Sequence, residues 1–179
     1  TIAIENGMTT SLLFEQLKDI RESVQIPLII MGYFNPMMQF GMEKFCQKCA
    51  EVGIDGLIIP DLPLFVYETE YKAIFEKYHL KNIFLISPQT SVERIQQIDA
   101  ISDSFIYMVS SAAVTGSQSG FGSEQMDYFK RIADLNLKNP QIVGFGIKDE
   151  ETFQQATQYQ KGAIIGSAFI NFLKENSIS

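Results

Sequence analysis

The chain has 179 residues, a length that favours one domain, and 46% of them are hydrophobic and 20% charged, as in ordinary globular proteins. Its formal net charge of −7 argues against a nucleic-acid-binding surface, because phosphate backbones select clusters of lysine and arginine. No apolar run approaches the roughly 18 residues that a membrane span needs, and no signal peptide is recognisable. We therefore expect one domain over residues 1–179, in the cytoplasm, without a membrane or nucleic-acid partner.

Helical and strand patterns alternate along the whole chain. The apolar spacing predicts helices over residues 10–24, 42–53, 66–80, 91–102, 123–136, 149–160 and 168–176. Continuous apolar runs, typical of strands buried on both faces, occupy residues 26–34, 55–60, 82–87, 105–110, 141–146 and 162–167. Strands that alternate with helices imply parallel pairing, since each strand returns to the same sheet through its helix.

Two architectures fit six strand–helix units: an open doubly wound sheet and a (β/α)8 TIM barrel. The open sheet is disfavoured because the first βα turn lacks G-x-G-x-x-G and no Walker A motif occurs. A complete barrel needs eight units and typically about 250 residues. We interpret the chain as an α/β protein with about six units of a TIM barrel, strands three to eight, incomplete at its N-terminus.

The two cysteines, Cys46 and Cys49, form a C-x-x-C pattern within a predicted helix. A redox pair is one interpretation of this spacing. A zinc site would need two further soft ligands, and the single histidine, His79, lies in a polar stretch. The helical spacing of the surrounding apolar residues favours two reduced cysteines and no metal.

Two neighbouring predicted strands end in glycine, within "VGFGI" and "IIGSAFI". In a TIM barrel, phosphate often binds at the loops after the seventh and eighth strands. Gly144, Gly146 and Gly166 would let the backbone approach a ligand closely, and Ser167 begins a helix whose dipole favours an anion. The alternative is that these glycines only form turns with positive φ. Their pairing at consecutive strand ends predicts a phosphate site that needs no lysine or arginine.

Other strand ends suggest a lid and an aromatic pocket. Thr115 and Gly116 lie in the small, polar segment "SAAVTGSQSGFG", which is either a lid over the phosphate or a flexible connector. Asp61 follows an apolar run, where its carboxylate could accept a hydrogen bond from a substrate N–H or could cap a helix or turn. Apolar and aromatic residues would surround a flat ligand, unless they only pack the core: Met31, Tyr33, Ile58, Pro60, Ile86 and Tyr107.

Five segments occur in the order seen in the tryptophan synthase alpha chain family, which the chain resembles over nearly its whole length: "PLIIMGYFNPMMQFG", "AEVGIDGLIIPDLP", "YMVSSAAVTG", "GFGI" and "GAIIGSA". The resemblance implies a TIM-barrel lyase that cleaves indole-3-glycerol phosphate to indole and glyceraldehyde 3-phosphate by a retro-aldol reaction. It also implies no cofactor in this chain. The implied partner is a beta chain that uses pyridoxal phosphate, in an alpha2-beta2 complex.

The same resemblance assigns roles to residues. It implies that the phosphate is held by Gly116, Phe145, Gly146, Gly166 and Ser167. It implies an indole site with Asp61 at the indole N–H and with these neighbours: Met31, Tyr33, Ile58, Pro60, Ile86 and Tyr107. Thr115 resembles a lid threonine, and three positions resemble residues that face the beta chain: Asn35, Pro36 and Pro63.

One departure from the family concerns catalysis. The family's glutamate general acid and its aspartate general base, the latter within "PFSDPLADGPTIQ", lie before "TI", with which this sequence begins. No catalytic residue of the family is therefore present, and we expect these 179 residues alone not to cleave substrate, whereas a longer native chain would. Two other interpretations are a different barrel enzyme for a phosphorylated indole precursor, and a phosphate-binding module that activates a partner. The first usually needs lysines at strand ends, and the sequence shows none there.

Overall fold

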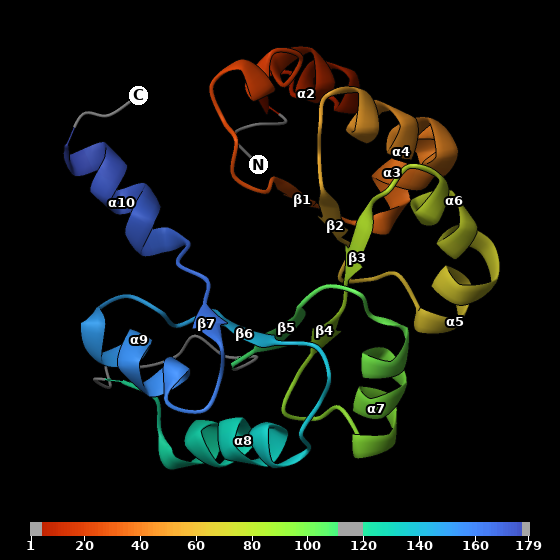
Figure 1. Ribbon diagram of the computed structural model, residues 1–179. Coiled ribbons are helices and arrows are strands. Elements are labelled where there is room, and N and C mark those ends of the chain that lie inside the picture. The colour runs from red at the N-terminus through yellow and green to blue at the C-terminus, as the bar shows by residue number, and fades with distance from the viewer. Residues whose placement is uncertain (1–4, 111–119, 177–179) are drawn as a thin grey trace. The chain divides into compact units, whose positions relative to one another are not determined.

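The computed structural model of the protein describes residues 5–110 and 120–176. The chain divides into two compact units, Thr1–Ile83 and Phe84–Ser179. Each unit contains a parallel sheet whose strands are joined by helices (Figure 1). This α/β pattern confirms the predicted fold class, since it consists of the repeated parallel units of a (β/α)8 barrel.

The first unit is a three-stranded parallel sheet in the order β1-β2-β3, formed by Ile29–Met31, Gly56–Ile58 and Lys81–Ile83. Its helices lie on one side of these strands (Figure 1) and are α2 Thr10–Gln16, α3 Phe34–Phe40, α4 Met42–Glu51, α5 Leu64–Val66 and α6 Lys72–Lys77. A 3-10 turn spans Ile20–Glu22, and a π-helical turn, Tyr67–Tyr71, joins α5 to α6.

Local signals explain several helix boundaries in the first unit. The Thr9 hydroxyl accepts a hydrogen bond from the Leu12 N–H at 3.1 Å, which caps α2. Helix α4 buries one face of its residues against the core: Met42, Phe45, Cys46 and Cys49. The Phe45 ring packs edge-on against Phe14 of α2, with ring centroids 5.1 Å apart. These contacts fix the helical layer beside the sheet.

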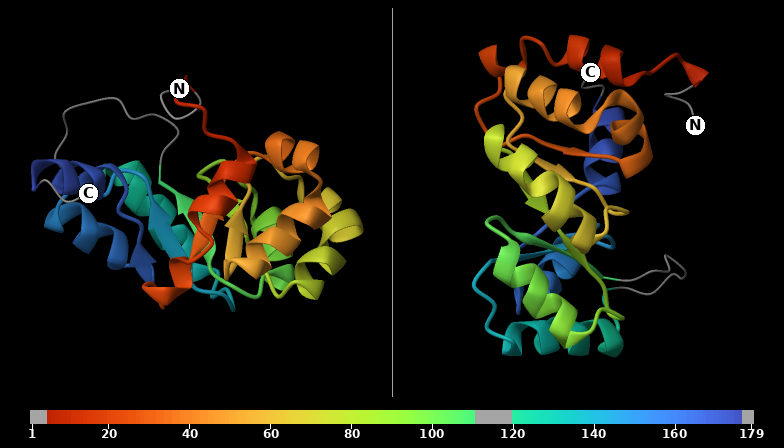
Figure 2. Two further views of the ribbon diagram at one scale, coloured as in Figure 1. Left: turned by 90° about the horizontal axis from the view of Figure 1, so that it is seen from above. Right: turned by 90° about the vertical axis from the view of Figure 1, so that its right-hand side faces the viewer.

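The second unit is a four-stranded parallel sheet in the order β4-β5-β6-β7, formed by Leu85–Ile86, Ile106–Val109, Gln141–Gly144 and Gly162–Ala163. Its helices are α7 Val92–Ile101, α8 Ser123–Asp134, α9 Glu150–Thr157 and α10 Ser167–Glu175. Helices α7, α8 and α9 cover one face of the sheet, as Figures 1 and 2 show. The fully buried side chains of this layer include Ile95, Ile106, Phe129, Ile132 and Val143.

Two caps set helix starts in the second unit. Ser91 accepts a hydrogen bond from the Arg94 N–H at 3.2 Å at the start of α7. Asp149 and Thr152 form a reciprocal capping box at the start of α9, in which the Thr152 N–H donates to Asp149 Oδ1 at 2.9 Å. The backbone and hydroxyl of Thr152 lower the pKa of the Asp149 carboxyl. The cap therefore strengthens when Asp149 is ionised.

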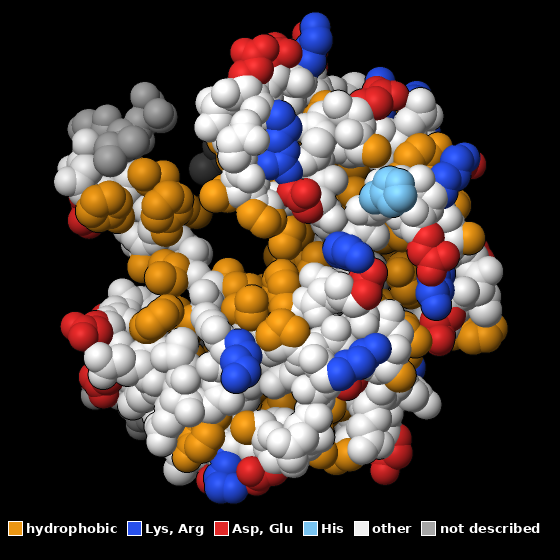
Figure 3. Space-filling model, in the orientation of Figure 1, with side chains coloured by type: hydrophobic (Ala, Val, Ile, Leu, Met, Phe, Trp, Pro, Cys, Tyr) orange, Lys and Arg blue, Asp and Glu red, His pale blue; other side chains and the backbone are white. Residues whose placement is uncertain are grey.

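Helix α10 differs from the others in the exposure of its apolar residues. Phe169, Ile170 and Phe172 are all exposed, and Figure 3 shows hydrophobic side chains gathered on this helix. None of the described residues of α10 is buried. One side of this helix lines the pocket described below, through Ser167, Ala168, Asn171, Phe172 and Glu175.

The structure differs from the prediction at several places. The helix predicted over residues 10–24 ends at Gln16, and a 3-10 turn follows at Ile20–Glu22. Phe34, predicted to end a strand, begins the unpredicted helix α3. The predicted strand over residues 82–87 divides at Phe84 into β3 and β4. The helix predicted over residues 66–80 is interrupted by the π-helical turn. Among residues 5–110 and 120–176, no helix is long and apolar enough to cross a membrane.

Cys46 and Cys49 are fully buried free thiols on α4. Burial raises the pKa of both from 9.0 to about 12, so neither forms the thiolate needed for redox or metal chemistry near neutral pH. No group of three or more potential metal-binding side chains occurs among the described residues.

The buried thiols predict a pH dependence of stability. Between pH 9 and about 12 the unfolded chain ionises both cysteines while the folded chain keeps them protonated, so the free energy of unfolding falls as pH rises. Urea unfolding at pH 7.5 and pH 10 should show that wild type loses more stability than the double variant Cys46→Ala, Cys49→Ala. Equal losses in the two proteins would contradict the burial of the thiols.

Candidate functional site

A cavity of about 620 Å³ in the second unit lies where β6 and β7 end. Five residues predicted for substrate or phosphate line it: Tyr107, Phe145, Gly146, Gly166 and Ser167. Ligands of parallel α/β proteins bind at the carboxyl ends of strands, so this cavity is the candidate functional site of the second unit. We call it the rim pocket.

The turn after β6 has an unusual backbone. Phe145 has a φ of +66° and Gly146 a φ of +78°, both in the left-handed region. For a residue with a side chain this conformation costs roughly 1 kcal/mol, so other contacts must hold Phe145 there. The Ser110 hydroxyl donates to the Phe145 carbonyl at 2.8 Å, and the Ser110 N–H donates to the Gly144 carbonyl at 3.1 Å. These bonds tie the turn to the end of β5.

Gly144 makes room for a neighbouring side chain. A Cβ atom at this position would lie 2.0 Å from the Tyr107 hydroxyl oxygen, so the glycine makes room for the tyrosine. The Tyr107 side chain is 5% exposed, and its ring centroid lies 6.0 Å from that of Phe145. Burial raises the pKa of Tyr107, which keeps the phenol neutral and able to donate a hydrogen bond.

The first turn of α10 supplies backbone donors to the rim pocket. Gly166 is the N-cap residue and has no side-chain cap bond. The first hydrogen bond within the helix runs from the Ile170 N–H to the Gly166 carbonyl at 3.2 Å. The N–H groups of Ser167, Ala168 and Phe169 come before it and therefore have no acceptor within the helix. The Gly146 N–H likewise has no acceptor among the residues that the structure describes. Free N–H groups and a helix dipole together favour an anion.

Two charged residues also line the rim pocket, Lys148 and Glu175. The sequence prediction contained no cation here, so Lys148 is a residue that it missed. Lys148 follows Gly146 by two positions, and this closeness to the glycine pattern was the only signal for it. Because Lys148 already interacts with other residues, it is not a free cation awaiting a ligand.

Asp61 lies in the first unit, after β2. Its Oδ1 accepts a hydrogen bond from the Phe34 N–H at 2.8 Å, so the carboxylate serves the start of α3. Asp61 thus binds the first N–H of α3 from the end of another element, which differs from the local helix N-cap or turn role that the sequence left open. Its Oδ2 has no hydrogen-bond partner among the described residues. The carboxylate therefore combines an anchored oxygen with an oxygen available to a ligand.

The remaining predicted residues are distributed over both units. Met31, Tyr33 and Pro60 are exposed at the ends of strands of the first unit, and Ile58 is buried on β2. Ile86 is buried on β4 and Tyr107 on β5. Three residues predicted to face a partner lie in the first unit, in the first turn of α3 or before α5: Asn35, Pro36 and Pro63. Thr115 and Gly116 lie outside the described residues.

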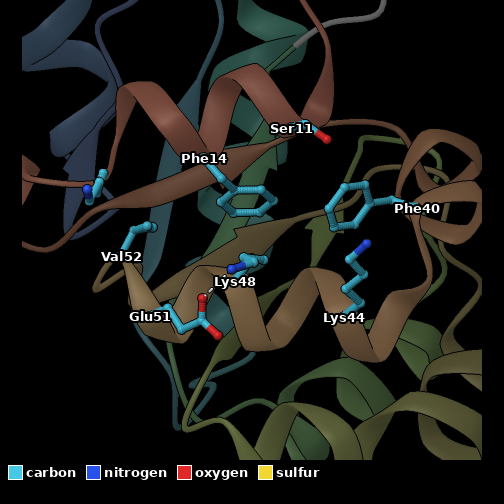
Figure 4. Close-up of a pocket in the computed structure, with 8 residues that line it drawn as sticks. Ser11, Phe14, Phe40, Lys44, Lys48, Glu51 and Val52 are labelled. Carbon is cyan, nitrogen blue, oxygen red and sulfur yellow. Dashed lines mark hydrogen bonds and ion pairs between the residues drawn. The ribbon is translucent and has the colours of Figure 1, made fainter.

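A second cavity, of about 410 Å³, lies among helices of the first unit. Phe14 and Phe40 are beside it, and Lys44 and Lys48 project from α4 (Figure 4). The Lys48 ammonium is paired with Glu51 at 2.6 Å, and the Lys44 ammonium lies 4.8 Å from the centre of the Phe40 ring. This second cavity is lined by no predicted site residue and by no strand end, so the rim pocket remains the candidate site.

The fold and the rim pocket define a class of protein: a TIM-barrel type α/β protein with a cavity at its strand ends. The family model described as "Tryptophan synthase alpha chain" matches residues 1–179. The chain is 73% identical to the tryptophan synthase alpha chain of Flavobacterium johnsoniae over 176 residues, which is 98% of this chain and 70% of that one. It is 69% identical to the tryptophan synthase alpha chain of Flavobacterium psychrophilum, over 100% of this chain and 71% of that one.

Solved structures agree with this result. The tryptophan synthase alpha chain of Legionella pneumophila matches with a TM-score of 0.82 and 31% identity, over 98% of this chain and 64% of that one. The alpha subunit from Pyrococcus furiosus matches with a TM-score of 0.84 and 28% identity, over 97% and 69%. The chain belongs to the tryptophan synthase alpha chain family, lyases of tryptophan biosynthesis that cleave indole-3-glycerol phosphate.

Proposed function

We propose that the rim pocket binds the phosphate of indole-3-glycerol phosphate through backbone N–H groups of Gly146 and of the first turn of α10. The observation that supports this most directly is that Gly146 and the first turn of α10 line one cavity, while their N–H groups have no acceptor among the described residues. Neither set depends on a cationic side chain, which suits a chain with a net charge of −7. We also propose that Gly116 contacts the phosphate and that Thr115 belongs to a lid. Both residues lie outside the described part of the chain.

We further propose that Asp61 accepts a hydrogen bond from the indole N–H through its free Oδ2. Protonation of indole C3, which precedes cleavage of the carbon–carbon bond there, places positive charge on the indole nitrogen. An anchored carboxylate stabilises that charge without having to reorient, and cleavage then returns the bonding electrons to the ring. The hydrogen bond from the Phe34 N–H provides this anchoring at Oδ1. The proposed indole neighbours are Met31, Tyr33, Ile58, Pro60, Ile86 and Tyr107.

The family implies a beta-chain partner. We propose the finer assignment that this partner is a pyridoxal-phosphate enzyme in a cytoplasmic alpha2-beta2 complex, and that the chain acts as one domain. The residues proposed to face the beta chain are Asn35, Pro36 and Pro63. Co-purification of both chains, followed by measurement of the mass of the complex, tests the stoichiometry. A complex that forms equally well after Asn35→Ala and Pro63→Ala would argue against this surface.

The phosphate assignment is tested by Gly166→Ala. No atom lies within 4 Å of a Cβ at this position, so the variant should keep its stability while a methyl group enters the pocket. The methyl group should keep the phosphate from reaching one of the backbone donors. We therefore expect the dissociation constant for inorganic phosphate, and KM for indole-3-glycerol phosphate, to rise about tenfold, which corresponds to the loss of one hydrogen bond to a charged group. Calorimetric titration of phosphate and steady-state kinetics of the full-length protein measure these effects.

The matched control is Gly162→Ala on the adjacent strand β7. Its Cβ would meet only Ile142, at 3.9 Å, and Gly162 does not line the rim pocket. This variant should bind phosphate like wild type. Unchanged binding in Gly166→Ala, with chemical-shift changes from phosphate located away from Gly146 and Ser167, would refute the proposed phosphate site.

A further inference from the structure

Ser110 is a buried serine at the end of β5, and the family assignment gives it no role. Its side chain is 2% exposed and does not line the rim pocket. It makes two bonds to consecutive carbonyl groups of the neighbouring chain segment. Its N–H donates to the Gly144 carbonyl at 3.1 Å, and its hydroxyl donates to the Phe145 carbonyl at 2.8 Å.

Bonds from one residue to two consecutive carbonyls require a turn. In an extended strand, successive carbonyl groups point to opposite sides, so only one of them can face a given neighbour. The bond to Gly144 continues the β5–β6 ladder. The bond to Phe145 forms only because the chain leaves the extended conformation there, with Phe145 at a φ of +66°. The Ser110 hydroxyl thus stabilises the left-handed turn that precedes Gly146.

The same turn is held from another direction by Phe121. A Cβ atom on Gly146 would lie 3.0 Å from the Phe121 ring. The Phe121 ring packs edge-on against the Phe129 ring, with centroids 5.1 Å apart. The backbone N–H of Phe121 donates to Gln155 Oε1 at 2.7 Å. The Gly146 backbone therefore has little freedom on this side. Among the described residues, the Ser110 hydroxyl is the side-chain donor to the carbonyl of the peptide that precedes Gly146.

We propose that Ser110 is a positioning residue of the phosphate site. By holding the Phe145 carbonyl, its hydroxyl fixes the peptide that bears the Gly146 N–H and so keeps this donor directed at the bound phosphate. This inference depends on the proposed phosphate site, and it adds a residue that does not itself touch the ligand. Ser110 acts only through Phe145 and Gly146.

The test compares Ser110→Ala, Ser110→Thr and Ser102→Ala in the full-length protein. The alanine variant removes the hydroxyl, whereas threonine keeps it. Ser102 is a matched control, because it is 3% exposed and its hydroxyl has no hydrogen-bond partner among the described residues. For Ser110→Ala we expect the dissociation constant for inorganic phosphate and KM to rise about three- to tenfold. We expect kcat to stay within about twofold.

Three results would support the inference together: weaker phosphate binding in Ser110→Ala, recovery in Ser110→Thr, and wild-type binding in Ser102→Ala. With saturating inorganic phosphate, faster hydrogen exchange of the Gly146 amide in Ser110→Ala than in wild type would show that the effect passes through the turn. A loss of stability without a change in phosphate affinity would overturn it, because it would leave Ser110 a purely structural role.

The Gly166→Ala variant separates this inference from the proposed function. If Gly166→Ala weakens phosphate binding and Ser110→Ala does not, only the role of Ser110 is refuted. If neither variant changes phosphate binding, the phosphate site itself is refuted. If both variants weaken binding, while Gly162→Ala and Ser102→Ala do not, both proposals are supported.

Discussion

Replacing Gly144 with alanine is expected to lower the free energy of unfolding by about 3 kcal/mol or more and to weaken phosphate binding. The added Cβ would lie 2.0 to 2.3 Å from three atoms of the Tyr107 ring and hydroxyl, far inside van der Waals contact. Tyr107 is 5% exposed, so it cannot move aside without disturbing the core. Because Tyr107 also lines the rim pocket, its displacement would change the shape of the site.

Urea unfolding and phosphate titration of Gly144→Ala measure both effects. Gly162→Ala serves again as the control for added volume without a clash. A second substitution, Tyr107→Leu, removes the atoms that the methyl group would meet, so the double variant should lose less than the sum of the two single losses. Strict additivity of the two substitutions would show that the destabilisation has another source.

Asp61→Asn is expected to reduce kcat/KM for cleavage of indole-3-glycerol phosphate by about 100-fold or more. The amide oxygen of asparagine can still accept from the Phe34 N–H, so helix α3 should keep its anchor. Its NH2 group replaces the free carboxylate oxygen, and a donor there cannot accept from the indole N–H. The substitution thus separates the proposed role in catalysis from the structural one.

Asp61→Ala provides the contrast. It removes both oxygens and should therefore cost about 1 kcal/mol of stability, as the loss of a helix cap does, in addition to the loss of activity. Steady-state kinetics and thermal unfolding of the full-length variants distinguish the two effects. Near wild-type activity in Asp61→Asn would mean that the carboxylate only supports α3.

The alternation of strands and helices could be predicted because both patterns are local in sequence. The apolar runs and helical periods of the second unit, for example, correspond to β5, α8, β6 and α9 with small boundary differences. Helix α3 was missed because Phe34 extends an apolar run and Pro36 resembles a helix breaker. Proline is tolerated in a first helical turn, where its missing N–H has no intrahelical acceptor.

The candidate site was predictable only in part. The glycines of the rim pocket were recognised because strand ends can be located along the chain. The contact between Ser110 and Phe145 joins residues 35 positions apart, and no local pattern indicates such a pair. For the same reason the crowding of Gly144 by Tyr107 and the bond between Asp61 and Phe34 became apparent only in the structure.

The donors proposed at Gly146 and at the start of α10 belong to the main chain. Alanine-scanning mutagenesis would therefore leave these donors in place and would underestimate their contribution to phosphate binding. The exceptions are glycines, which gain a methyl group. Amide N–H groups also do not titrate in water. The pH dependence of monoester binding should consequently follow the second ionisation of the phosphate, near pH 6, more closely than that of any side chain.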